Sequence, residues 1–165
     1  MNNSIQQQTI NDINNIITFL SKRDISELSS SALANKFGII QVDMIIILGN
    51  SIPYIARLGA KAFKTGLAKD IMIVGGIGHS TKYLINNVLK DNKYKDININ
   101  DKSEAEILSE IIATTENIKQ NKIILENKST NCGSNAYESF KLLKDRDQIP
   151  KSIKIGRASC RERGS

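Results

Sequence analysis

The sequence is poor in the residue types from which many sites and scaffolds are built. Among its 165 residues are one histidine, His79, and two cysteines, Cys132 and Cys160. Two cysteines give no disulfide framework. Without a second histidine or clustered cysteines, the chain also lacks the usual ligand set of a metal site. We therefore expect neither a bound metal nor a disulfide-stabilised fold.

Long apolar runs and dense positive charge are missing as well. No apolar run approaches the length of a membrane span, and the N-terminus, Met1-Asn2-Asn3-Ser4, has neither the basic nor the apolar region of a secretory signal. The formal net charge is +6, but Lys and Arg are spread out and aromatic residues are few. This distribution is typical of a solvated surface and not of a nucleic-acid interface. We expect a soluble, cytoplasmic protein without membrane or nucleic-acid partners.

What the sequence does contain is an alternation of apolar strands and amphipathic helices. We expect strands at 42–48, 70–74 and 121–126, and the start of a fourth at 152–154, with helices at 52–65, 82–89, 103–116 and from 136 to about 144. In the last of these helices, Ala136, Phe140 and Leu143 are expected to point inward. Such alternation predicts an α/β fold with a parallel sheet.

The N-terminal part of the chain has a different character. Residues 9–20 place Ile10, Ile13, Ile16, Ile17 and Leu20 on one side of an amphipathic helix, and a shorter helix is expected at 31–37, ending near Gly38. We interpret the two as a small helical cap that leads into the main domain.

Three polar loops follow the expected parallel strands. They are Gly49-Asn50-Ser51, the glycine-rich loop from Gly75 to Thr81, and the stretch from Glu126 to Asn135. Because ligands of parallel α/β sheets bind beyond the carboxyl ends of the strands, the three loops are expected to form one composite site.

The glycine-rich loop, Gly75-Gly76-Ile77-Gly78-His79-Ser80-Thr81, lies between a strand and a helix. Its backbone N–H groups and the helix N-terminus could hold an anion or another polar ligand. The spacing matches neither the dinucleotide-binding fingerprint nor the P-loop. A plain tight turn beneath a helix is an equally good interpretation of the loop alone.

Taken together, the motifs resemble the YdcF/SanA/ElyC domain family, a domain of unknown function, and most closely its soluble YdcF branch. The matching pieces are Leu48-Gly49-Asn50, the glycine-rich loop, the pair Glu104-Ala105 and the stretch 126–135, in the family's order. The resemblance implies a three-layer Rossmann-like fold and S-adenosylmethionine binding without a settled reaction. Where the family often has Thr-x-Glu-Asn, this chain has Cys132-Gly133-Ser134-Asn135. It also lacks the family's later segment with Asp and Arg.

The C-terminal stretch from Ile155 to Arg163 looks like a translated sequencing adapter that breaks off a strand begun at Ser152-Ile153-Lys154. We therefore expect an N-terminal helical segment at 1–41, an incomplete Rossmann-like domain at 42–154, and a non-native tail at 155–165 that makes no ligand contacts.

Several candidate residues also have structural interpretations. His79 could serve as a ligand donor or a general base, or simply cap the loop. Glu104 could reach the site or only stabilise its helix start, and Glu126 could accept from a ligand or from neighbouring loop amides. Residues 129–131 suit helix capping. We expect ligand contacts from Gly49, Asn50, Gly75, Gly76, Gly78, His79, Ser80, Thr81, Glu104, Glu126, Ser129, Thr130, Asn131 and Asn135.

Two further residues have mainly structural interpretations. Cys132 lies near a helix start, which could lower its pKa and make it a nucleophile, but no base is nearby in sequence, so a structural cysteine is favoured. Arg57 is expected to form a surface ion pair.

Three functions stay open at this stage. The leading hypothesis is binding of a small ligand, S-adenosylmethionine or a nucleotide-like compound, with or without catalysis. The second is a hydrolase or transferase that acts on a phosphorylated or envelope-precursor substrate. The third is a non-catalytic envelope-maintenance factor.

Overall fold

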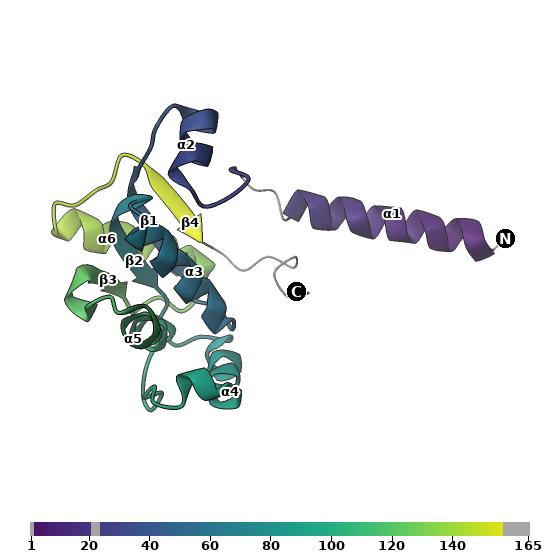
Figure 1. Ribbon diagram of the computed structural model, residues 1–165. Coiled ribbons are helices and arrows are strands. Elements are labelled where there is room, and N and C mark those ends of the chain that lie inside the picture. Colours follow the sequence, from purple (N-terminus) through teal and green to yellow (C-terminus); the bar gives the residue numbers. More distant parts are fainter. Residues whose placement is uncertain (1, 21–23, 157–165) are drawn as a thin grey trace.

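The computed structural model describes residues 2–20 and 24–156 (Figure 1). Within them, the helices are α1 (Asn2–Leu20), α2 (Ser30–Phe37), α3 (Pro53–Lys64), α4 (Thr81–Lys90), α5 (Glu104–Glu116) and α6 (Cys132–Asp145), with short 3-10 turns η1 (Asn92–Tyr94) and η2 (Gln120–Lys122). The strands are β1 (Val42–Leu48), β2 (Ala68–Val74), β3 (Ile123–Glu126) and β4 (Ile153–Gly156).

The four strands form one parallel sheet in the order β3-β2-β1-β4. This confirms the predicted α/β fold with a parallel sheet. Leu48 pairs with Val74, and Val74 pairs with Glu126, so β1, β2 and β3 end level with one another. Because the strands are parallel and in register, the three polar loops that follow them leave the sheet at the same edge.

Helices cover both faces of the sheet, which gives the expected three layers (Figure 1). The larger core lies on one face, where Ile45, Ile47, Ile71 and Ile73 of the sheet pack with apolar residues of α2, α3, α4 and α5. On the other face, Met44, Ile46, Met72, Val74 and Ile124 pack with Leu143 of α6. The near-continuous apolar character of β1 and β2 follows from burial on both faces.

The two N-terminal helices are placed differently. Helix α2 is capped by Ser29, whose side chain accepts from the Ala32 N–H, and by Gly38 in the left-handed conformation (φ +70°), and it buries Leu33 in the larger core. Helix α1 extends away from the sheet (Figure 1). Its residues Ile10, Ile13 and Ile16 are exposed.

The expectation for the inward face of α6 was wrong in part. Leu143 is buried as predicted, but Phe140 is 56% exposed and Ala136 is exposed too. The buried positions of this helix are Ser139 and Leu143, one turn apart. Phe140 lies about 100° around the helix from Ser139, which turns its ring away from the sheet.

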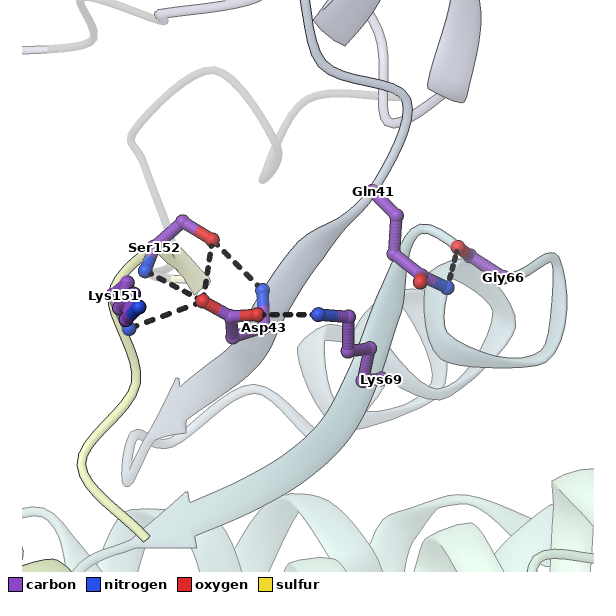
Figure 2. Close-up of polar contacts among 6 residues, drawn as sticks. All are labelled: Gln41, Asp43, Gly66, Lys69, Lys151 and Ser152. Atoms are coloured by element: carbon purple, nitrogen blue, oxygen red, sulfur yellow. Dashed lines mark hydrogen bonds and ion pairs between the residues drawn. The ribbon is translucent and has the colours of Figure 1, made fainter.

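Strand β4 is held beside β1 by the Asp43 side chain (Figure 2). The Asp43 carboxylate accepts hydrogen bonds from the Lys151 N–H (3.1 Å), from the Ser152 N–H and hydroxyl (3.0 Å each), and from the Lys69 ammonium (2.7 Å). The Asp43 N–H in turn donates to the Ser152 hydroxyl oxygen (2.9 Å). This cluster lies at the amino end of β1 and fixes the segment that leads into β4.

The strand expected to break off after Lys154 continues through Gly156, because Ile155 and Gly156 pair with Ile46 and Ile47. The remainder of the segment 155–165, with Cys160, lies outside the described residues. Among the residues that are described, no helix is long and apolar enough to cross a membrane.

Candidate functional site at the carboxyl edge of the sheet

The loops after β2 and β3 are bonded to each other. The Gly75 N–H donates to the Glu126 carbonyl (2.9 Å), and the Gly76 N–H donates to the Ser129 carbonyl (2.8 Å). A Cβ atom on Gly76 would lie 2.2 Å from that same carbonyl oxygen, so only glycine permits this approach. The glycine-rich loop and the 126–135 stretch therefore lie side by side, as predicted.

The N-terminus of α5 is anchored on the same loop. The Glu104 N–H donates to the Gly76 carbonyl (3.1 Å), and the Ala105 N–H donates to the Gly75 carbonyl (2.8 Å). Ser103 and Glu106 form the predicted capping box, in which each side chain accepts from the backbone N–H of the other residue. These bonds fix the position of Glu104 at the strand ends.

The side chain of Glu104 links the loops after β1 and β2. It is buried, with 5% of its surface exposed. Its Oε1 atom accepts from the Ser80 hydroxyl (2.6 Å) and the Thr81 hydroxyl (2.9 Å). Its Oε2 atom lies against Gly49, where an added Cβ would be 2.3 Å away. A carboxylate can occupy this place because residue 49 has no side chain.

The second oxygen of Glu104 is open. No group of the described residues donates a hydrogen bond to Oε2. In the described part of the chain, the only fully buried side-chain polar atom without a partner is Ser109 Oγ, so Oε2 is not fully buried. Oε2 must therefore be reached by solvent. The site thus presents one acceptor oxygen between the ends of β1 and β2.

Glu126 is bonded within its own loop. One of its oxygens accepts from the N–H groups of Lys128 (2.6 Å) and Ser129 (3.0 Å), and the other accepts from the Ser129 hydroxyl. Both Glu126 and Ser129 are buried. The sequence allowed Glu126 to accept either from a ligand or from neighbouring loop amides. The structure shows the bonds to the loop amides.

The start of α6 is also bonded internally. Asn131 is the N-cap, its side chain accepts from the Ser134 N–H (3.0 Å), and the Ser134 hydroxyl accepts from the N–H groups of Asn131 (3.0 Å) and Thr130 (2.9 Å). Capping was expected for this stretch and is confirmed for Asn131. Ser134, at the position where the resembled family often has Glu, completes the capping box.

The remaining candidates lie in the three loops at this edge. Asn50 closes its own turn, donating to the Leu48 carbonyl (2.8 Å) and accepting from the Ile52 N–H (2.7 Å). His79 is exposed, with its ring centroid 5.9 Å from that of Tyr83. Thr130 and Cys132 are exposed, and Asn135 is half-buried.

The backbone amides of the glycine-rich loop fall into two groups. Those of Gly75 and Gly76 are bonded as described, and the Gly78 N–H donates to the Thr81 hydroxyl oxygen (2.8 Å). The N–H groups of Ile77, His79 and Ser80 make no hydrogen bond with any described residue. These three amides are the backbone donors of the loop that have no acceptor among the described residues.

Arg57 lies outside this edge and is bonded elsewhere. Its guanidinium contacts the Glu116 carboxylate at 3.0 Å, which joins α3 to α5. The hydrogen bond that Arg57 donates to Glu116 raises the pKa of Arg57. The predicted ion pair is therefore present, but it is partly buried because Glu116 is only 7% exposed.

Comparison with known families gives no assignment, because no protein-family model matches the chain. Among the described residues, no group of three or more His, Cys, Asp or Glu side chains is placed to hold a metal ion. The polar groups gathered around the open oxygen are Glu104 itself and the hydroxyls of Ser80 and Thr81, and the neighbouring loop adds three unbonded amides.

Proposed function

We propose that the protein binds a small ligand at the carboxyl edge of its sheet, beside Gly49, Ser80 and Glu104. S-adenosylmethionine or a nucleotide-like compound is the candidate ligand. The observation that supports this most directly is the buried Glu104 carboxylate with one oxygen open beside Gly49. A ligand that reaches this edge could donate to the open oxygen in place of water, and a donor with a positive charge would do so more strongly than water.

The type of ligand follows from the groups available at this edge. Oε2 of Glu104 can accept a hydrogen bond, and the N–H groups of Ile77, His79 and Ser80 can donate one. These suit a ligand with ammonium or hydroxyl groups at one end and an acceptor-rich group at the other. S-adenosylmethionine has both, and the resemblance to the YdcF branch favours it over a plain nucleotide. Location beyond the strand ends agrees with the usual place of ligands in parallel sheets.

Isothermal titration calorimetry of Gly49→Ala tests this proposal. The added methyl group would overlap the Glu104 carboxylate and displace it. We expect the wild type to bind S-adenosylmethionine and Gly49→Ala to bind it at least about tenfold more weakly, as expected when one charge-assisted hydrogen bond is lost. Circular dichroism spectra of both proteins check that the variant is folded.

Gly133→Ala is the matched control. It adds the same methyl group in the first turn of α6, where the nearest contact of a Cβ is Asn131 Oδ1 at 3.3 Å. The control should bind as the wild type does. Absence of binding by the wild type to both S-adenosylmethionine and adenosine monophosphate would overturn the proposal, and so would equal binding by Gly49→Ala.

A further inference from the structure

We infer that this site selects a ligand which brings a positively charged donor to Glu104, and that it disfavours a phosphate at the same position. The inference rests on the proposed function, since it concerns the ligand of the same site. It follows from the charge around Glu104, the hydroxyl donors on its first oxygen, and the amides that the loop retains.

Glu104 has no cationic partner in the described part of the chain. The ion pairs there are Arg57–Glu116, Lys69–Asp43, Lys102–Glu110 and Lys154–Asp24, all of which involve other carboxylates. Unlike Glu116, which faces Arg57, the equally buried Glu104 receives only two neutral hydroxyl donors. Buried charges in proteins are normally paired, because removing an ion from water is costly. Glu104 therefore has no cation beside it among the described residues, and its charge is favoured only by the start of α5 and by neutral donors.

The lysines of the neighbouring loops do not supply this cation. Lys82, in the first turn of α4, has its ammonium 5.0 Å from the ring centroid of Tyr83. The Lys128 side chain is exposed, and only the backbone N–H of that residue is bonded at this edge, to Glu126. A ligand is then the source of positive charge that could approach Oε2.

A phosphate in this position would meet the opposite situation. Like charges a few ångströms apart in a partly desolvated site repel strongly. The amides of Gly75, Gly76 and Gly78, which a phosphate-binding loop would offer, are bonded within the protein. An ammonium, in contrast, would form a charge-assisted hydrogen bond with Oε2, which is stronger than a bond from a neutral hydroxyl.

Three ligands that differ only at the 5′ position of adenosine isolate this effect. They are 5′-amino-5′-deoxyadenosine, adenosine and adenosine monophosphate, which carry an ammonium, a hydroxyl and a phosphate. Calorimetry should rank their affinities for the wild type in that order. The amino compound should bind at least about a hundredfold more tightly than adenosine monophosphate, with about a factor of ten for each of the two steps in the series.

Glu104→Gln removes the charge and keeps an oxygen that can accept from Ser80 and Thr81. We expect this variant to lose the preference, so that the ratio between the ammonium and phosphate ligands falls at least about tenfold. Glu138→Gln is the control, since it makes the same change of charge on α6 at a half-buried residue outside the site. It should keep the wild-type ratio.

The outcomes separate the inference from the proposal beneath it. If adenosine monophosphate binds the wild type as well as the amino compound does, or if Glu104→Gln keeps the ratio, the charge inference is overturned while ligand binding stands. If none of the three compounds binds, and S-adenosylmethionine does not bind either, the proposed function fails and the inference fails with it. Should Glu104→Gln not fold, the ranking of the wild type alone decides.

Discussion

Glu104 and Glu126 lie at the same edge of the sheet and are almost equally buried, at 5% and 3% exposed. Glu126 directs both oxygens into its own loop, whereas Glu104 keeps one oxygen open beside Gly49. Glu126 is therefore bonded entirely within its own loop, and Glu104 is the carboxylate on which the proposed ligand site depends.

Replacement of Glu126 should lower stability. Glu126→Ala removes three hydrogen bonds and leaves the buried Ser129 hydroxyl without its acceptor. We expect the free energy of unfolding to fall by about 1–3 kcal/mol, the cost of leaving a buried polar group unpaired. Urea denaturation followed by circular dichroism measures this change.

Asp96→Ala is the matched control for Glu126→Ala, because Asp96 is exposed and its side chain makes no hydrogen bond with the described residues. Its free energy of unfolding should stay within about 0.5 kcal/mol of the wild type. A Glu126→Ala protein as stable as the control would contradict the structural role of this carboxylate.

At the residue scale, contacts between neighbours in sequence were predictable and distant contacts were not. The capping box of Ser103 and Glu106 follows from a spacing of three residues and is present. The bond from Ser80 to Glu104 joins residues 24 positions apart, and no pattern in the sequence indicates it. The sequence also could not show which groups donate to Glu126, because loop amides and a ligand can both offer N–H donors.

At the scale of elements, the entry of the chain into strand β4 is fixed by the carboxylate of Asp43 in addition to the pairing with β1. Asp43, in β1, bonds Lys151 and Ser152 and thereby fixes the segment that enters β4 (Figure 2). The hydrogen bonds from Lys69 and then from Ser152 lower the pKa of Asp43 from 3.8 to about 2. The folded state therefore binds the proton of Asp43 less readily than the unfolded chain does.

This lowered pKa predicts a pH dependence. The contribution of Asp43 to stability should be fully present above pH 3.8 and should be lost as the pH falls through about 2. Urea midpoints of the wild type and Asp43→Asn, measured between pH 6 and pH 2, should differ most at pH 6 and converge at the acid end. A constant difference across this range would contradict the role of the ionised carboxylate.

The elements themselves were largely predictable, since apolar periodicity and turn residues are local. The strands at β1, β2 and β3 and the helices between them appear where the patterns indicate. The inward face of α6 was not predictable in full, because the helix has buried residues only at Ser139 and Leu143. Its pattern alone could not show that Phe140 faces away from the sheet.

At the scale of the whole molecule, the two faces of the sheet are covered unequally. Helices α2 to α5 contribute side chains to the core on one face. Among the described helices, only α6 contributes side chains to the core on the other face. On that second face Ile153 and Ile155, whose partners in β1 are Met44 and Ile46, are about half exposed. The position of β4 beside β1 arises from pairing between distant segments, which sequence periodicity does not encode.

The central claim is that a ligand binds at the carboxyl edge of the sheet, and ¹H–¹⁵N NMR spectroscopy of the labelled protein during titration with S-adenosylmethionine tests it most directly. The account predicts that amide shifts change for Gly49, Ile77, His79 and Glu104, while those of Asp43 and Ser152, at the opposite edge, stay constant. No shift changes at saturating ligand, or changes gathered around Asp43 and Ser152, would contradict the account.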